Sequence, residues 1–141
     1  MSTFIFMYTI YTDGAYSSTR NQGGIGIVVL RDENLILTHS KMFKNTTNNQ
    51  MELMAVIIGL RCISKSIDAL TIVTDSQYVL GCATKGWKRK KNRALWALFD
   101  REFAILKTKC QNVTWKWTHG HADSKWNNLC DELAVSASHE V

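Results

Sequence analysis

No stretch of the 141-residue chain is apolar over the roughly 18 residues that a membrane-spanning helix needs. The apolar run at residues 4–8 lacks the basic flank and the small-residue cleavage site of a secretory signal, and it continues directly into Tyr11-Thr12-Asp13-Gly14. We therefore interpret this run as part of a first core strand over residues 3–12, in a protein without a membrane anchor.

Paired cysteines are also missing. The four cysteines are scattered and form no Cys-x-x-Cys motif; they are Cys62, Cys82, Cys110 and Cys130. Zinc sites need clustered ligands, and disulfide frameworks are typical of small secreted chains. We expect ordinary free thiols in a reducing compartment, and so a cytoplasmic protein.

Acidic residues are absent from one part of the chain. Between Gln77 and Phe99 there are six basic residues and no acid, whereas the other 11 of the 17 basic residues are balanced by 12 acids. The net charge of +5 is therefore one patch. We call residues 85–93 the basic segment; such a segment is either a solvated helix end or a nucleic-acid-binding surface. Its basic residues are Lys85, Lys88, Arg89, Lys90, Lys91 and Arg93.

The length and composition are those of one globular domain. The chain has 45% hydrophobic and 21% charged residues, which is enough apolar material to bury a core and too little charge for a disordered chain. No repeat, low-complexity tract or linker divides the sequence. We therefore predict a single domain over residues 1–141.

Hydrophobic periodicity predicts the element order βββαβααβα. Residues 3–12 are apolar on both alternating faces, as in a central strand that is covered on both sides. Thr47-x-x-Gln50 matches a capping box before a run of apolar residues with helical spacing. The remaining strands are expected at 25–30, 35–43, 69–74 and 113–118, and the remaining helices at about 76–83, 92–109 and from 125 onward. The fold class is α/β, a mixed five-stranded sheet with helices on both faces.

Four acidic residues lie outside the turns and polar helix faces where most acids of this chain fall. We place Asp13 and Asp75 at the ends of apolar strands, Glu52 in the first turn of the helix after the third strand, and Asp131 near the start of the last helix. Taken singly, each is also explained as a cap, a turn residue or an ion-pair partner. Strand ends beside helix starts are, however, where open α/β sheets bind ligands. Converging carboxylates repel unless a cation lies among them, and hard oxygen ligands suit Mg²⁺ or Mn²⁺.

Four stretches of the sequence closely resemble the type 1 ribonuclease H family, in the family's order and over essentially the whole chain. They are Tyr11-Thr12-Asp13-Gly14, Thr46-Thr47-Asn48-Asn49-Gln50-Met51-Glu52-Leu53, Thr74-Asp75-Ser76-Gln77-Tyr78-Val79, and Gly120-His121-Ala122 through Cys130-Asp131-Glu132-Leu133-Ala134. The resemblance implies a ribonuclease H-like fold and an endoribonuclease that hydrolyses the RNA strand of RNA–DNA hybrids, leaving 5′-phosphate and 3′-hydroxyl ends. We expect a monomer, and Met1 with the last helix favours a free-standing enzyme over a domain of a larger polymerase.

The same resemblance implies a catalytic quartet of Asp13, Glu52, Asp75 and Asp131 that binds two Mg²⁺ ions, with Mn²⁺ able to substitute. One ion lowers the pKa of a water and the other stabilises the leaving 3′-oxygen, with the ions about 4 Å apart. His121 corresponds to a loop histidine that assists proton transfer or product release. On the residues alone it is a surface histidine.

An enzyme specific for hybrids has to detect 2′-hydroxyls on one strand, and amide side chains are suited to this because they donate and accept. The resemblance assigns this role to Asn48 and Gln77, with Asn49 nearby, and it assigns a DNA-strand phosphate contact to Thr47. On the residues alone, these positions of the 47–49 stretch are a helix cap. The second contact is expected along the basic segment, from Trp87, Lys88, Arg89, Lys90 and Lys91.

Two departures from the family pattern are visible. Many bacterial members carry a longer basic handle where this chain has only the span from Tyr78 to Trp96, so we expect weaker, more salt-sensitive binding with intact chemistry. The loop Ser18-Thr19-Arg20-Asn21 differs from the family's Gly-Asn-Pro-Gly-type turn, so no residue role is carried over there.

Two alternatives remain open from the sequence. A related DNA nuclease or resolvase of the same fold would cut a DNA duplex or junction as readily as a hybrid. A catalytically silent hybrid-binding module would be expected to lack a carboxylate, and all four are present.

Overall fold

The computed structural model describes residues 5–119 and 124–141. Its elements follow the predicted order βββαβααβα, and the five strands form one mixed sheet in the order β3-β2-β1-β4-β5. The predicted fold class is therefore confirmed. The elements are β1 (Met7–Ser17), β2 (Gln22–Arg31), β3 (Asn34–Lys44), α1 (Asn48–Arg61), β4 (Ala69–Thr74), α2 (Gln77–Thr84), α3 (Arg93–Lys109), β5 (Asn112–Trp117) and α4 (Lys125–Ser138).

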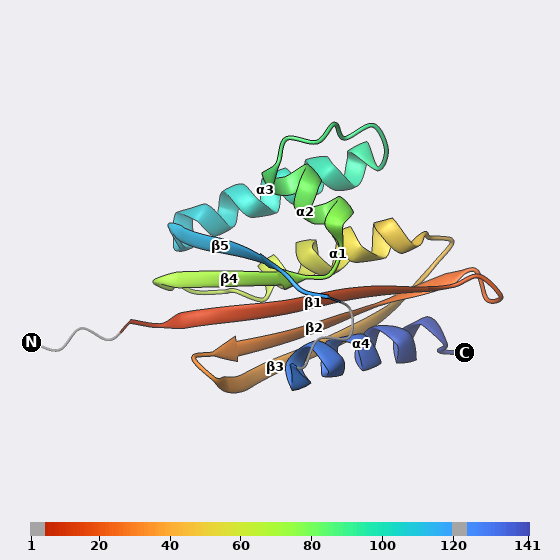
Figure 1. Cartoon of the computed structure of the whole chain (residues 1–141), viewed down its shortest axis with the longest axis horizontal. Coiled ribbons are helices and arrows are strands. Elements are labelled where there is room, and N and C mark those ends of the chain that lie inside the picture. The colour runs from red at the N-terminus through yellow and green to blue at the C-terminus, as the bar shows by residue number, and fades with distance from the viewer. Residues whose placement is uncertain (1–4, 120–123) are drawn as a thin grey trace, which may run out of the picture.

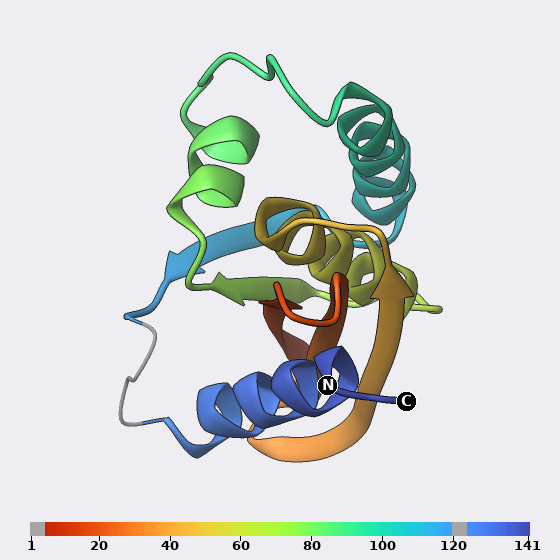
Figure 2. The same cartoon turned by 90° about the vertical axis from the view of Figure 1, so that its right-hand side faces the viewer.

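β1 is the central strand of the sheet. It pairs antiparallel with β2 and parallel with β4, while β3 and β5 form the two edges. Figures 1 and 2 show α4 on one face of the sheet and α1, α2 and α3 on the other, with α2 and α3 stacked outside α1. Covering on both faces explains why β1 is apolar on both alternating sides, as predicted.

The hydrophobic core has a large part and a small part. The large part lies between the sheet and α1 and extends to α3, with Ile10, Leu53, Ile57 and Trp96 almost fully buried. The small part lies under α4 and is centred on Val28, Leu30 and Cys130. Among the helices that the structure describes, none combines the length and hydropathy needed to cross a bilayer.

The small core layer depends on Gly26 of β2. A Cβ there would collide with the carbonyl oxygen of Cys130 and would lie 2.9 Å from the backbone nitrogen of Ala134, both in α4. Because these are backbone atoms, the whole helix would have to move. We expect Gly26→Ala to destabilise the protein by about 1–3 kcal/mol, measured as a lower Tm.

A matched control is Gly86→Ala, because a Cβ there meets open space and the loss comes only from its φ of +71°. That strain costs about 1 kcal/mol. A Tm for Gly26→Ala equal to that of the unaltered protein would contradict the close packing of α4 against β2.

β1 begins and ends later than the predicted strand over residues 3–12. It begins at Met7, and Ile5 and Phe6 precede it and are exposed, so the prediction that they belong to a core strand is wrong.

The parallel pairing of β1 with β4 ends at Tyr11 opposite Val73, but its antiparallel pairing with β2 continues to Ser17 opposite Gln22. The prediction that Asp13 ends this strand is therefore wrong, because the hairpin with β2 prolongs it. Asp13 nevertheless lies just past the end of the parallel ladder, beside the end of β4.

Candidate active site

Three carboxylates from three separate elements meet where the parallel ladder ends. Asp13 lies in β1, Glu52 in α1, and Asp75 directly after β4; each offers an oxygen within 4.8 Å of the others. Asp13 and Glu52 are only 6% and 7% exposed, and Asp75 is half-buried. The sequence indicated four converging carboxylates, and the structure brings these three into one cluster.

Gly14 holds two of these side chains in place. Its backbone nitrogen donates to Glu52 Oε1 at 2.5 Å and to Asp13 Oδ1 at 2.9 Å. A Cβ on Gly14 would collide with the backbone of α1 at Met51 and Glu52. Glycine at this position therefore lets the central strand approach α1 closely enough for the two carboxylates to share one amide.

Glu52 is positioned by the buried face of α1 and not by the start of the helix. The predicted cap at Thr47 is confirmed, since its hydroxyl accepts a hydrogen bond from the Gln50 nitrogen at 3.2 Å. α1 then begins at Asn48, and its first turn contains no acid. The prediction that Glu52 lies in the first turn is therefore wrong; it lies in the second, among buried residues that pack on the sheet.

Asp131 lies at the border of the cluster. It is half-buried in α4 and is not one of the three mutually close carboxylates, but its hydrogen bond and its charge both help to raise the pKa of Asp13. Its neighbour Cys130 is fully buried and donates its thiol to the Gly26 carbonyl at 2.9 Å. Burial and then the nearby carboxylates raise the pKa of Cys130, so it stays a neutral thiol behind the site.

The cluster holds more carboxyl groups than it can ionise. Burial, followed by the charge of Asp75, raises the pKa of Asp13 from 3.8 to about 8. Burial, followed by the charges of Asp75 and Asp13, raises the pKa of Glu52 to about 11. Without a cation, the protein therefore keeps protons on this site at neutral pH.

Asp75 adds a second indication of a missing positive partner. Its Oδ1 is buried and has no hydrogen-bond partner among the residues that the structure describes. A buried acceptor without a partner is costly, and a divalent cation supplies the interaction. Since every potential ligand atom in the cluster is a carboxylate oxygen, the residues fit a hard divalent cation.

The residues predicted to read the nucleic acid lie on the surface beside this cluster. Thr47, Asn48 and Asn49 are exposed at the start of α1, one turn before Glu52, and they line a groove together with Lys91 and Asn92. Gln77 is exposed as the first residue of α2, two positions after Asp75. The amides therefore lie within one helical turn of a cluster carboxylate along the chain.

The basic segment links the end of α2 to the start of α3, as the loop at the top of Figure 2 shows. Lys88, Lys90 and Lys91 are exposed along it. Trp87 is 48% exposed, and its ring packs so closely against Gly81 that a Cβ there would collide with it. These residues are available for contact with a ligand.

Arg89 differs from the lysines on either side. Its Nη1 lies 2.8 Å from both carboxylate oxygens of Asp100, so its charge is already paired within the chain. The prediction that Arg89 contacts nucleic acid stays a prediction, and the structure shows a different use of its guanidinium.

The sequence did not reveal a polar link between α1 and the basic segment. Gln50 Nε2 donates to Asn92 Oδ1 at 3.1 Å, and Asn92 Nδ2 donates to the Tyr78 hydroxyl at 3.0 Å. The Gln50 Oε1 accepts a hydrogen bond from the Thr46 hydroxyl. The Gln50 side chain therefore does not bond to the Thr47 backbone nitrogen, which is the second hydrogen bond of a capping box. The positive φ of 59° at Asn92 is a conformation that asparagine adopts more readily than most residues. No local pattern in the sequence predicts this conformation.

His121, the predicted auxiliary residue, lies outside the residues that the structure describes. Its role stays a prediction.

A mixed sheet in this order, with carboxylates where its central parallel ladder ends, defines the ribonuclease H-like class of proteins. The fold is shared with the N-terminal RNase H domain of a Mycobacterium tuberculosis protein, solved as a fusion with maltose-binding protein, at a TM-score of 0.78 and 22% identity over 94% of each chain. The family model described as RNase H matches residues 7–139, and the chain belongs to this family.

Curated relatives agree with this assignment. A ribonuclease H of Desulforamulus reducens is 38% identical, over 92% of this chain and 86% of its own length. A ribonuclease H of Rippkaea orientalis is 39% identical, over 94% of this chain and 85% of its own length. A ribonuclease HI of Vibrio parahaemolyticus is 37% identical, over 92% and 88%. The chain is thus an enzyme of the ribonuclease H class.

Proposed function

We propose that this chain is a single-domain endoribonuclease, over residues 1–141, that hydrolyses the RNA strand of RNA–DNA hybrids and leaves 5′-phosphate and 3′-hydroxyl ends. The observation that carries the proposal is the cluster of Asp13, Glu52 and Asp75, whose oxygens lie within 4.8 Å of one another. Membership of the RNase H family supports the substrate.

The metal-binding residues in this proposal are Asp13, Glu52 and Asp75, with Asp131 as the fourth ligand at the border, and the cofactor is two Mg²⁺ ions that Mn²⁺ can replace. When bound, the ions activate water and stabilise the leaving 3′-oxygen. The Gly14 amide fixes the orientation of Glu52 and Asp13. His121 assists proton transfer or product release.

Strand identity is read beside the metal site. Asn48 and Gln77 recognise 2′-hydroxyls through their amides, with Asn49 adjacent, and Thr47 contacts a phosphate of the DNA strand. Their exposure next to the carboxylates supports these roles. We also propose a monomer in the cytoplasm, a location that agrees with four free thiols.

The test compares labelled RNA–DNA hybrid, duplex RNA and duplex DNA as substrates, each with Mg²⁺ or with EDTA, for the unaltered protein and for Asp13→Asn. We expect cleavage of the hybrid alone, only with Mg²⁺, and none by the variant. Hybrid cleavage that survives EDTA or Asp13→Asn would exclude the metal mechanism. Equal cleavage of duplex DNA would favour the related DNA nuclease, and no turnover at all would favour the silent module.

Replacing Lys88, Lys90 and Lys91 together by alanine is expected to weaken hybrid binding and flatten its salt dependence, while kcat at saturating substrate is kept. Each lost phosphate contact lowers the slope of log K against log salt by about 0.7–0.9. The measurement is the dissociation constant of a labelled hybrid over a salt series.

A matched control removes three other exposed lysines, Lys41, Lys65 and Lys107, and so changes the net charge equally. We expect a smaller change of slope for it. An unchanged slope after the triple substitution in the basic segment would contradict a phosphate contact there.

A further inference from the structure

The basic segment carries charges that repel one another, yet it follows a defined path between two helices. Charged linkers extend and stay mobile unless contacts hold them. The backbone of the segment has positive φ at Gly86 and Asn92, so the segment does not continue either helix. Contacts must therefore hold the segment in place. Asn92 is linked to Gln50 and Tyr78 at one end of it, and Arg89 contacts both flanking helices from within it.

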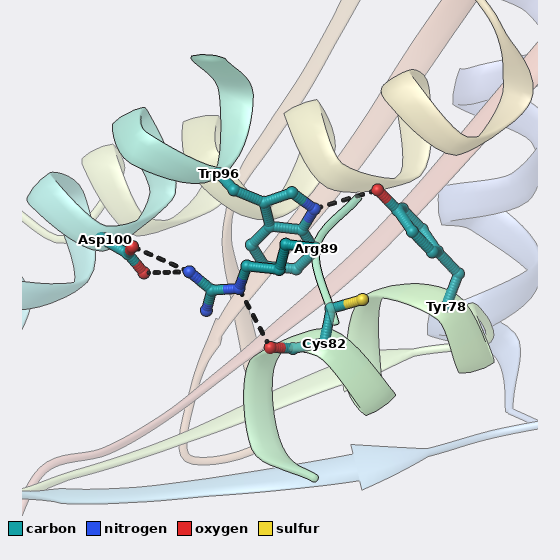
Figure 3. Close-up of polar contacts among 5 residues, drawn as sticks. All are labelled: Tyr78, Cys82, Arg89, Trp96 and Asp100. Atoms are coloured by element: carbon teal, nitrogen blue, oxygen red, sulfur yellow. Dashed lines mark hydrogen bonds and ion pairs between the residues drawn. The ribbon is translucent and has the colours of Figure 1, made fainter. Parts of the chain in front are cut away.

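Arg89 binds the end of α2 through its Nε, which donates to the Cys82 carbonyl at 3.2 Å (Figure 3). Cys82 is in the last turn of α2, where carbonyl groups have no partner within the helix. A guanidinium at this end also interacts favourably with the negative end of the helix dipole. Arg89 therefore caps α2.

The same guanidinium binds α3. Its Nη1 contacts both oxygens of Asp100 at 2.8 Å, and its central carbon lies 4.4 Å from the centroid of the Trp96 ring. Trp96 is 2% exposed, and its indole nitrogen donates to the Tyr78 hydroxyl at 2.9 Å, so the ring is a fixed platform. Arginine suits this site because a planar guanidinium can stack on a ring and still donate in its own plane.

We propose that Arg89 is a positioning residue for hybrid binding. By joining α2 to α3, it holds the basic segment so that Lys88 and Lys90, its exposed neighbours in sequence, face outward to the phosphates. This proposal rests on the proposed function for the role of those lysines. In this proposal the guanidinium serves as an anchor and not as a phosphate ligand, because its Nε and Nη1 are engaged by Cys82 and Asp100.

Two variants separate positioning from a direct phosphate contact. Arg89→Met removes the anchor, and Asp100→Asn weakens it while also removing a negative charge from this surface. By electrostatics alone, Asp100→Asn would strengthen binding to a polyanion. If Arg89 is an anchor, both variants raise the KM and the dissociation constant of the hybrid, each by roughly fivefold, with kcat unchanged.

Further readouts distinguish an anchor from general structural damage. The double variant Arg89→Met/Asp100→Asn is expected to be no worse than either single one, and the swap Arg89→Asp/Asp100→Arg is expected to restore part of the affinity. Arg89→Met is expected to keep the salt slope of the unaltered protein. The control Arg101→Met removes an equal charge from an exposed neighbour of Asp100 and is expected to change the KM by less.

Anchoring is also tested without any nucleic acid, by the rate at which a lysine-specific protease cuts at Lys88 and Lys90. We expect Arg89→Met and Asp100→Asn to be cut several times faster than the unaltered protein. Equal rates would overturn the anchor, and so would tighter hybrid binding by Asp100→Asn or a salt slope reduced by about 0.9 in Arg89→Met. Failure of the unaltered protein to bind or cut a hybrid would overturn the proposed function and the role of Arg89 in directing Lys88 and Lys90 to phosphates. The protease experiment would still show whether Arg89 holds the basic segment in place.

Discussion

Asp75→Asn is expected to abolish hybrid cleavage and, at the same time, to raise the Tm of the metal-free protein. The buried Asp75 Oδ1 has no partner among the described residues, and after burial the charge of Asp75 is the largest cause of the raised pKa values of Asp13 and Glu52. Asparagine removes this charge and supplies an amide that can donate to the neighbouring carboxylates. It also removes a ligand for the divalent cation.

The expected loss of kcat is on the order of 10³-fold or more, as for other residues that act as one catalytic unit. The expected gain in stability is about 1–2 kcal/mol, or roughly 3–6 °C in Tm for a domain of this size. The measurements are single-turnover cleavage with Mg²⁺ and thermal unfolding in EDTA.

The control for Asp75→Asn is Asp32→Asn, which removes the same charge from an exposed turn where φ is 56°, a conformation that asparagine also adopts readily. This variant should keep both activity and Tm. A lowered Tm for metal-free Asp75→Asn would show that the carboxylate cluster does not destabilise the fold. Activity within tenfold of the unaltered protein would exclude Asp75 as a metal ligand.

The order of the elements could be predicted from the sequence because each one has its own hydrophobic period. The length of β1 could not. Its apolar alternation stops before Asp13, and the residues from Gly14 to Ser17 form a strand because β2 pairs with them. This pairing depends on β2, so it could not be predicted from the apolar pattern of β1 alone.

The site residues show a similar division. Asp13 and Asp75 were singled out because strand ends beside helix starts bind ligands, but their convergence was expected only from the family resemblance. Glu52 was placed one turn too early, and the buried face of α1 positions it instead of the start of the helix. Arg89 appears in the sequence as one of several equal charges. Its pairing with Asp100, across the start of α3, is a tertiary contact that only the structure shows.

The stability of the metal-free protein is expected to fall as the pH rises from about 5 to about 9, and divalent cations should offset more of this loss at the higher pH. In the folded protein the pKa is about 8 for Asp13 and about 11 for Glu52, whereas both values are about 4 in an unfolded chain. Between these limits the folded state binds more protons than the unfolded state. The stability that these groups contribute is therefore fully present below about pH 4 and is lost as the pH rises through the folded pKa values.

Each group that is protonated only in the folded state lowers the stability by about 1.4 kcal/mol per pH unit, or roughly 4 °C in Tm, so the largest slope for the two groups together is about 2.7 kcal/mol per pH unit. The slope is measured by thermal unfolding in EDTA. Adding Mg²⁺ at about 100 times its dissociation constant should raise the stability by about 2.7 kcal/mol. Glu52→Gln is the control, because glutamine cannot ionise and the slope should become flatter. An equal slope in this variant, or the same gain from Mg²⁺ at both ends of the pH range, would contradict the linkage. Protons and divalent cations compete for the same carboxylates, so cleavage should also weaken at acid pH unless the Mg²⁺ concentration is raised.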